Sequence, residues 1–257
     1  MRQEPPQVPP TQVPPTGVAK VTAIIVCMTD GERPYAKAAV DSVARQTVPV
    51  RALCYVQESN GWIDAMVRDL PGITVRRIPL TPLGAVRNLG VAESTTEYVA
   101  FLDGDDVWLP QKTERQLALI ESSGADLVGA DHILVRADGV RFGYALARNL
   151  AMPSAWLVRR SVMLRHPFKS VFAEDGEWWM RTRDVVDKRR LPEFLIEYRV
   201  RPNSISSAHA GKRRKEIACR VGSVPVLREA LLAGTWLMHH INRRDQYVWH
   251  DGIGRML

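Results

Sequence analysis

The chain has 257 residues and a formal net charge of +7, with 35 lysines and arginines against 28 aspartates and glutamates. Its 46% hydrophobic and 25% charged residues are ordinary for a globular protein that buries a full core. No apolar run approaches the roughly 20 residues of a bilayer-spanning helix, and the N-terminus lacks the order of a signal peptide. The three cysteines, Cys27, Cys54 and Cys219, show no close pairing, which predicts neither a disulfide framework nor a zinc site. We therefore expect a soluble, cytoplasmic protein whose basic excess faces nucleic acid, a membrane surface or an anionic substrate.

The N-terminal segment differs in composition from the rest of the chain. Its first 17 residues hold six of the 17 prolines and few apolar side chains, so they can build neither a core nor a sheet. We expect a disordered Pro-rich tail over residues 1–17. A ligand for a proline-binding groove has the same composition and is the alternative.

Beyond the tail, apolar runs alternate with amphipathic stretches. Four runs predict buried strands, at 21–28, 52–56, 73–78 and 98–103. Three helices are expected after such runs, starting near Pro34, Gly84 and Pro110. This alternation predicts right-handed βαβ units and a mostly parallel sheet, so the expected fold class is α/β.

The pattern changes beyond Ala125. Residues 126–135 and 141–146 flank an Ala-Asp-Gly turn, which predicts an antiparallel hairpin. Further strands are expected at 154–160 and 193–200, and the C-terminal residues have a helical pattern. A small antiparallel portion and C-terminal helices should therefore follow the parallel sheet.

Three carboxylates follow the fourth predicted strand, at Asp103, Asp105 and Asp106. Ligands of open α/β sheets bind at the carboxyl ends of the strands, so the residues after Met28, Val56 and Leu102 should face one crevice. Close carboxylates repel one another unless a cation or solvent compensates them. Magnesium or manganese would do so while sharing its coordination with substrate phosphates, whereas a solvated Asp-Gly turn is the simpler alternative.

Two further features carry chemically useful side chains. Glu174 and Asp175 open an acidic segment; such acids commonly only complement a helix dipole, but one of them could accept a proton. Trp178 and Trp179 behind them are more often core residues than a ligand platform. Arg87 lies between two glycines, and its planar guanidinium suits phosphate. Together these residues suggest a nucleoside-diphosphate substrate whose diphosphate is the leaving group.

Seven segments in this order resemble the family 2 glycosyltransferases of GT-A fold, from about Val21 to Ser207. They are VTAIIVCM, DSVARQT, GAVRNLG, AFLDGDDVWLPQKTERQ, SAWLVRRSVM, AEDGEWWMR and YRVRPNSIS. The resemblance implies a Rossmann-like, mostly parallel sheet with helices on both faces. It also implies a catalytic domain over 18–210, with a nucleotide-binding half at about 18–125, an acceptor half at about 126–210, and a helical extension over 211–257.

The resemblance also implies roles for individual residues. Asp175, with Glu174 beside it, matches the acidic pair that supplies the general base of inverting members, which transfer the sugar in a single displacement. Asp103 and Asp105 match the family's Asp-x-Asp motif, which holds Mn²⁺ or Mg²⁺ beside the diphosphate. The residues expected to contact the nucleotide sugar are Met28, Thr29, Glu58, Arg87, Asp103, Gly104, Asp106 and Arg201.

The chain departs from the family pattern at three places. Residues 57–60 read Gln-Glu-Ser-Asn instead of Asp-Asp-Gly-Ser, so only Glu58 keeps a carboxylate there. Residues 27–30 lack the aromatic side chain that often packs on the base. Arg201 stands where many members have a metal-binding histidine, with His209 as a weak substitute. A pyrimidine nucleotide therefore does not follow from the resemblance, and Arg201 could meet the diphosphate directly.

Two other classes of function stay open on the sequence alone. A nucleotidyltransferase also uses acids and a metal, but it normally carries a glycine-rich phosphate loop that residues 29–32 do not form. A GT-A-like protein that has lost activity and binds only a nucleotide or a partner would fit the altered residues.

The position of the basic residues in the sequence indicates which partners to expect. Residues 181–220 hold 12 lysines and arginines against five acids, which accounts for the whole net charge. We expect a nucleotide-sugar donor and no nucleic acid; the acceptor class stays open among a glycan, a lipid-linked sugar, a natural product and a peptide. The run at 212–215 predicts a solvated helical face or a peripheral contact with an anionic partner or membrane.

Overall fold

The computed structural model describes residues 17–68, 70, 72–147, 152–201, 217 and 219–245. The predicted Pro-rich tail lies outside the described residues except for Gly17, and so does His209.

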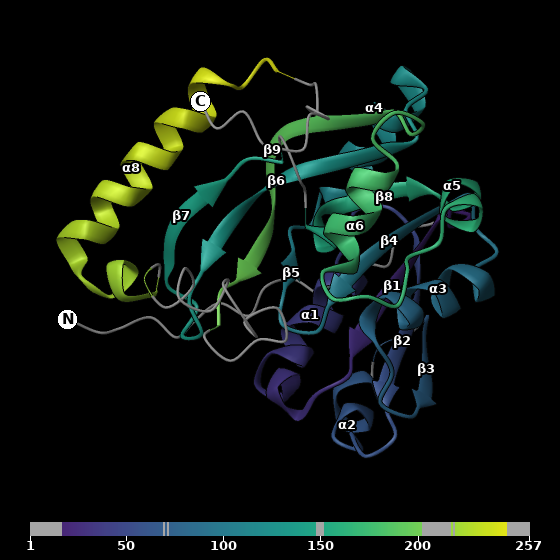
Figure 1. Ribbon diagram of the computed structural model, residues 1–257. Coiled ribbons are helices and arrows are strands. Elements are labelled where there is room, and N and C mark those ends of the chain that lie inside the picture. Colours follow the sequence, from purple (N-terminus) through teal and green to yellow (C-terminus); the bar gives the residue numbers. More distant parts are fainter. Residues whose placement is uncertain are drawn as a thin grey trace.

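Four parallel strands form the first half of the sheet. They are β1 (Val21–Cys27), β2 (Val50–Gln57), β3 (Ile73–Ile78) and β4 (Tyr98–Asp103). Their spatial order is β3-β2-β1-β4, so β1 lies inside the sheet and every one of its residues is buried (Figure 1). A strand buried on both faces needs a continuous apolar run, which is why VTAIIVC does not alternate. The predicted α/β class and parallel strands are confirmed.

Short connections place helices between these strands. They are a 3₁₀ turn (η1, Asp30–Glu32), α1 (Arg33–Ala44), α2 (Ile63–Val67) and α3 (Leu83–Glu93). Pro34 lies in the first turn of α1, where its missing N–H costs no hydrogen bond. The carboxyl ends of β1 and β4 consequently lie beside each other, together with the start of α1.

The second half of the sheet is mixed. Its strands are β5 (Val107–Trp108), β6 (Leu127–Val135), β7 (Arg141–Ala145), β8 (Trp156–Arg159) and β9 (Lys188–Arg199). The order continues from β4 as β8-β6-β9-β5, with β7 paired to β6 in the predicted antiparallel hairpin. β8 is antiparallel to both β4 and β6, and thereby joins the two halves into one nine-stranded sheet.

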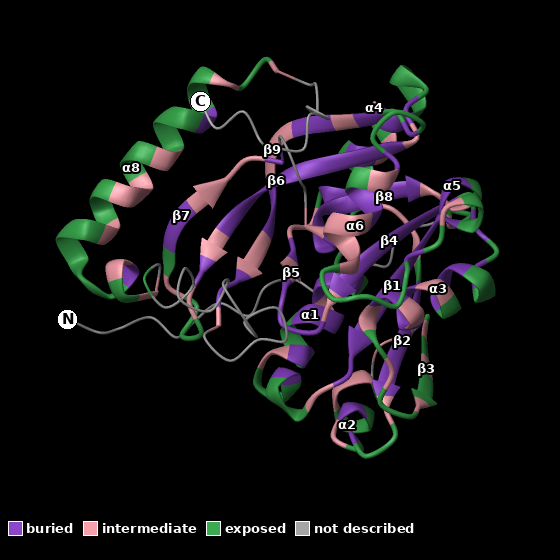
Figure 2. Cartoon of the chain, in the orientation of Figure 1, coloured by how far each residue is buried: buried purple, intermediate pink, exposed green. Residues whose placement is uncertain are grey.

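Helices of the second half flank this mixed part of the sheet. They are α4 (Lys112–Ser123), a 3₁₀ turn (η2, Pro153–Ala155), α5 (Arg160–Arg165), α6 (Glu174–Arg181) and α8 (Pro225–Ile241). Figure 2 shows buried residues concentrated on the central strands and exposed residues along α8 at the molecule's edge. No described helix is both long and apolar enough to span a bilayer, and the buried Cys27 and Cys54 are free thiols.

Several predicted boundaries were wrong. β2 begins two residues before residue 52. The helix expected from Pro110 begins at Lys112, because the Pro110 carbonyl accepts a hydrogen bond from Thr47 N (3.0 Å). The strand expected at 154–160 is limited to β8 by η2 and α5. β9 begins five residues earlier than residue 193, because Pro192, which has no N–H to donate, lies where the pairing with β6 shifts register.

Candidate active site

Asp103 ends β4, and the turn after it carries Asp105 and Asp106; contacts with β1 and η2 hold this segment. Gly104 N donates to Val26 O (2.9 Å), and Asp103 N donates to Ser154 Oγ (3.1 Å). A Cβ atom added to Gly104 would lie 2.6 Å from Cys27 Sγ, so this close approach requires glycine. The glycine predicted to contact the nucleotide sugar therefore also sets the position of the acids on either side of it.

We expect Gly104→Ala to lower the free energy of unfolding by about 1–3 kcal/mol, because the buried Cys27 and β1 must shift to admit the methyl group. Chemical denaturation monitored by circular dichroism measures this change. Gly234→Ala in α8 is the matched control, since no atom lies within 4 Å of its added Cβ. Equal stability of the two variants would contradict the conclusion that residue 104 must be glycine.

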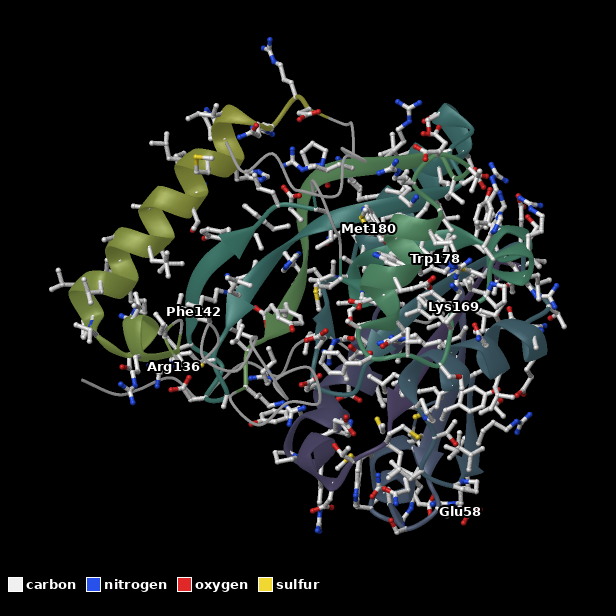
Figure 3. All side chains as sticks on the ribbon, viewed as in Figure 1. Glu58, Arg136, Phe142, Lys169, Trp178 and Met180 are labelled. Atoms are coloured by element: carbon white, nitrogen blue, oxygen red, sulfur yellow. The ribbon has the colours of Figure 1, made fainter. Side chains whose placement is uncertain are left out.

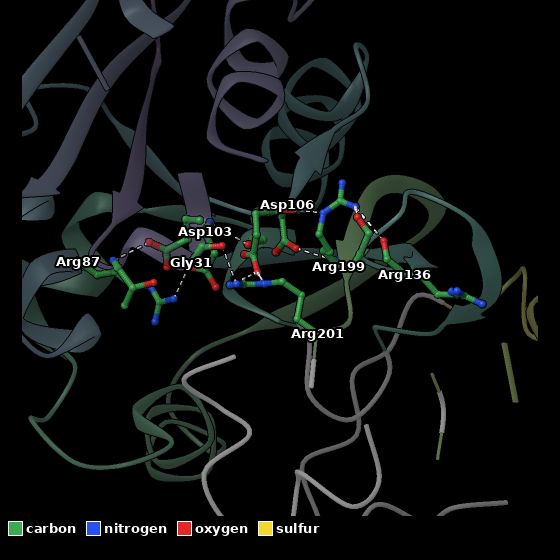
Figure 4. A network of polar contacts seen from close by, with 12 residues as sticks. Gly31, Arg87, Asp103, Asp106, Arg136, Arg199 and Arg201 are labelled. Atoms are coloured by element: carbon green, nitrogen blue, oxygen red, sulfur yellow. Dashed lines mark hydrogen bonds and ion pairs between the residues drawn. The ribbon is translucent and has the colours of Figure 1, made fainter. Parts of the chain in front are cut away.

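Arg87 joins the acidic turn to the start of α6. Its side chain, from α3, is 2% exposed, and Nη2 lies 2.6 Å from Asp103 Oδ1 while Nη1 pairs with Glu174 Oε1 (Figure 4). Burial disfavours the charged guanidinium, but Asp103 and Glu174 outweigh burial and raise the pKa of Arg87. The arginine predicted to lie near the nucleotide thus makes its described ion pairs within the protein, and it connects a proposed metal-site acid to the proposed base segment.

Arg201 neutralises the second acid of the motif. Its Nε and Nη2 atoms lie 2.7 and 2.6 Å from Asp105 Oδ2, and Nη1 donates to Gly31 O (2.9 Å). The guanidinium lies over the ring of Tyr35, 5.5 Å from its centre. Burial raises the pKa of Asp105, and the charge of Arg201 opposes that rise. Arg201 therefore contacts a proposed metal ligand, and its contact with the donor stays a prediction.

Asp106 is held by β9. Its Oδ1 accepts a hydrogen bond from Arg199 N (2.9 Å), whereas its buried Oδ2 accepts none of normal geometry. Burial and the charges of Asp105 and Asp103 raise the pKa of Asp106 well above its usual value, and the nearby Ser154 hydroxyl offsets this only in part. Arg199 itself donates to the carbonyls of Asp105 (3.0 Å) and Arg136 (2.8 Å), as Figure 4 shows. The acid cluster is thus incompletely neutralised by its own arginines.

The predicted base segment begins at a strained residue. Ala173 precedes α6 with φ of 54°, in the left-handed region that non-glycine residues rarely adopt. Glu174, the next residue, forms an ion pair with Arg87. Burial raises the pKa of Glu174, and the charge of Arg87 opposes the rise. Asp175 is half-buried, and its Oδ1 accepts a hydrogen bond from Gly176 N (2.8 Å). Of the two acids, Asp175 is the one without an ion pair among the described residues.

The tryptophans behind this segment are core residues, as the sequence favoured. Trp178 is fully buried and Trp179 nearly so, and both contact Trp156, with ring centres 5.0 and 5.6 Å apart. This packing fixes α6 against β8. It places the start of α6, with Asp175, at a defined position relative to β4.

Three other residues that were predicted to contact the donor differ in how far they are buried. Met28 is buried in the core, and Thr29 N donates to Glu32 Oε2 (2.7 Å). Glu58 is exposed at the end of β2, near α2 (Figure 3). None of the three has a described contact with the acid cluster, so their donor contacts stay predictions.

Two residues of this region went unnoticed in the sequence. Glu32 is a buried acid whose pKa is raised to about 7, first by burial and also by Asp105 and Asp103. Tyr35 stacks under Arg199, 4.4 Å from ring centre to guanidinium, as well as under Arg201. Both lie in the segment after β1, Glu32 in η1 and Tyr35 in α1, so the rule that ligands bind at the carboxyl ends of strands indicated their region, but not their partners.

A model of the family described as glycosyl transferase family 2 matches residues 23–190. An uncharacterized glycosyltransferase of Nostoc sp. is 46% identical over 56 residues, which span 22% of this chain and 17% of the Nostoc protein.

Solved structures show the same fold at low sequence identity. S. aureus TarS 1-349 in complex with UDP-GlcNAc is 16% identical with a TM-score of 0.59, over 87% of this chain and 73% of that one. A mannosyltransferase from Pyrobaculum calidifontis, PcManGT, in complex with GDP-Man and Mn²⁺, is 14% identical with a TM-score of 0.59, over 81% and 63%. The chain spans 42% of a longer TarS structure. With its family model covering most of the sheet, this chain belongs to glycosyl transferase family 2 and has the GT-A type of fold.

Proposed function

We propose that this protein transfers a sugar from a nucleoside-diphosphate sugar to an acceptor hydroxyl, with inversion at the anomeric carbon. One observation carries the proposal: Arg87 connects Asp103, at the end of β4, to Glu174, directly before Asp175. One buried arginine thus holds both an acid of the proposed diphosphate site and the acid next to the proposed base. The ligands named for the neighbours, UDP, UDP-GlcNAc and GDP-Man, support the donor class.

The acid cluster fits a divalent cation. Within the described segments, no group of three or more His, Cys, Asp or Glu side chains is already arranged around a metal position. The buried Asp106 Oδ2 nevertheless lacks a normal hydrogen bond, and the pKa of Asp105 is raised despite Arg201. Carboxylate oxygens suit Mn²⁺ or Mg²⁺, which share their coordination with substrate phosphates. Asp103 and Asp105 would hold the ion, which when bound supplies positive charge to the departing diphosphate.

The chain's own residues supply positioning and a proton acceptor. Asp175 would take the hydroxyl proton of the acceptor as that oxygen bonds to the anomeric carbon and the bond from this carbon to the diphosphate breaks. The Gly176 N–H holds one carboxylate oxygen of Asp175, which leaves the other to accept the proton. We assign donor binding to residues 18–125 and acceptor binding to residues 126–210, as the position of Asp175 in α6 suggests.

Donor hydrolysis and transfer test the proposal directly. A panel of nucleotide sugars is first screened by thermal shift with Mn²⁺, because a ligand that binds only the folded state raises its apparent stability. The donor that stabilises the protein is then incubated with candidate acceptors, and release of nucleoside diphosphate is measured with and without metal. NMR of the product's anomeric proton reports inversion, and retention would overturn the single displacement.

A donor-binding protein without transferase activity is the second candidate. The Arg201–Asp105 ion pair favours it, since Arg201 occupies a carboxylate expected to bind metal. The same assays separate the two functions. Donor-dependent stabilisation with no diphosphate release for any acceptor would establish the binding protein.

We expect Arg201→Gln to tighten Mn²⁺ binding by at least about tenfold, because a positive charge that competes for Asp105 is removed. Electron paramagnetic resonance of free Mn²⁺ measures the dissociation constant without any donor or turnover. Arg141→Gln is the matched control, since its pair with Glu197 lies on the exposed edge of β7. Unchanged or weaker Mn²⁺ binding in Arg201→Gln would contradict the competition.

A further inference from the structure

The helix α8 packs on the sheet through one face. Its Thr235 Oγ1 accepts a hydrogen bond from Tyr144 N (3.1 Å) of β7, and Leu231 lies one turn earlier against Gly143. Figure 1 shows α8 running along β7 at the edge of the molecule. Leu231, Thr235 and His239 are spaced by four residues, so they form one helix face, and this face points to the sheet.

A buried ionic cluster anchors the C-terminal end of α8. His239 Nδ1 lies 2.8 Å from Oδ2 of the fully buried Asp131 in β6. Arg190 Nε of β9 lies 2.8 Å from Asp131 Oδ1, and its Nη1 donates to Asn242 O (2.7 Å) just beyond the helix. Burial raises the pKa of Asp131, but Arg190 and His239 outweigh burial and lower it, so the carboxylate stays charged. The orientation of α8 is therefore set by specific buried contacts.

The opposite face of α8 is mostly apolar and exposed, with the exposed Glu229 and His240 along one edge. Val226, Leu237 and Ile241 are 78%, 53% and 68% exposed. They share this face with Ala230 and Ala233, which are also exposed. No lysine, arginine, aspartate or glutamate occurs between residues 230 and 241. An exposed apolar strip on an anchored helix indicates a contact surface, because monomeric proteins rarely expose large contiguous apolar patches.

Both ends of this strip carry more basic than acidic residues. Arg243 and Arg244 follow the helix, before Asp245, while Arg220 precedes it and Arg228 pairs with Glu229 in its first turns. A second copy packed against the strip, parallel or antiparallel, would bring basic ends together. The C-terminal residues 246–257 contain one aspartate and one arginine, so they offer no acidic surplus. Anionic lipid headgroups complement both ends, and the acyl boundary accommodates the apolar centre.

We infer that α8 lies on an anionic lipid surface with Val226, Leu237 and Ile241 inserted at the boundary between headgroups and acyl chains. Trp236, 49% exposed beside this strip, is the kind of side chain enriched at membrane interfaces. This surface does not depend on the proposed transferase function.

Flotation of the full chain with vesicles of phosphatidylcholine alone, or with added phosphatidylglycerol, tests the inference without any nucleotide sugar. We expect binding to the anionic vesicles that weakens as salt rises, and at least about tenfold weaker partitioning of Leu237→Glu, which loses apolar insertion and adds repulsion. Val185→Glu is the matched control, because Val185 is 63% exposed and lies outside α8, and it should bind as the unmodified chain does. Thermal melts confirm that both variants fold.

Several results would overturn the inference. They are equal binding to neutral and anionic vesicles, no vesicle binding, and an equal loss in both variants. A dimer seen by light scattering that Leu237→Glu dissociates would show instead that a second copy covers the strip. Vesicle binding that appears only after removal of residues 246–257 would show that the chain's own C-terminus covers it.

Discussion

Asp175→Asn is expected to lower the turnover number by roughly 10²- to 10⁴-fold while leaving donor affinity unchanged, because an amide cannot accept the acceptor's proton. The variant keeps the local structure, since the Asn oxygen can still accept the hydrogen bond from Gly176 N. Asp175 also has no ion pair among the described residues, so its replacement leaves no positive charge without its counter-charge. Initial rates of nucleoside-diphosphate release give the turnover number, and isothermal titration with the donor gives the affinity.

Asp184→Asn controls for loss of a carboxylate near α6. Its side chain is 74% exposed and pairs only with the neighbouring Arg183 among the described contacts, so activity should not change. Glu174→Gln makes a second comparison. It removes a partner of Arg87 and should lower stability as well as rate, whereas Asp175→Asn should lower the rate alone. Unaffected turnover in Asp175→Asn would reject the assignment of the base.

Arg87→Met is expected to lower the free energy of unfolding by about 3 kcal/mol, because it leaves two carboxylates without their buried counter-charge. This loss is at the lower end of the usual range for breaking a buried ion pair, because the Asp103 and Glu174 side chains are 27% and 13% exposed. Activity should be lost as well, because Arg87 holds the proposed metal-site turn and the start of α6 together. Urea denaturation measures the stability change.

The pH dependence of the variant follows from the pKa of Glu174. Burial already raises this pKa while Arg87 opposes the rise, so removing Arg87 should raise it further. A carboxyl group whose folded pKa lies above its unfolded pKa binds more protons in the folded state, so stability falls as pH rises through that window. The deficit of Arg87→Met should therefore be largest near neutral pH and shrink as pH falls.

Two comparisons distinguish the loss of this buried ion pair from the loss of an exposed one. Arg76→Met breaks a surface pair with Glu93, in which both side chains are substantially exposed, and should change stability little. The double variant Arg87→Met/Glu174→Met should be less destabilised than the sum of the two single variants, because each single change leaves an unpaired buried charge. Additive losses would mean that Arg87 and Glu174 do not act as a pair.

The sequence predicted the parallel half of the fold well, because local patterns specify it. β1 and β3 lie within a residue of their predicted ranges. In β1 the reason is that a strand buried on both faces must be continuously apolar. The mixed half was less accessible to such patterns. β9 crosses Pro192, which reads as a break in a single strand and is tolerated only because the pairing with β6 shifts register there.

The candidate site divides in the same way. The sequence by itself determined which residue types are present: acids at the end of β4, an acidic pair at the start of α6, and arginines before and after them. The order of its segments also predicted the family, which the comparisons confirmed. Only the tertiary structure decided their partners. Arg87 meets Glu174 across 87 residues and Arg201 meets Asp105 across 96 residues, and no local spacing encodes such pairs. They depend on how the strands are ordered in the sheet, and so does the contact of His239 with Asp131 that leaves the apolar face of α8 turned outward.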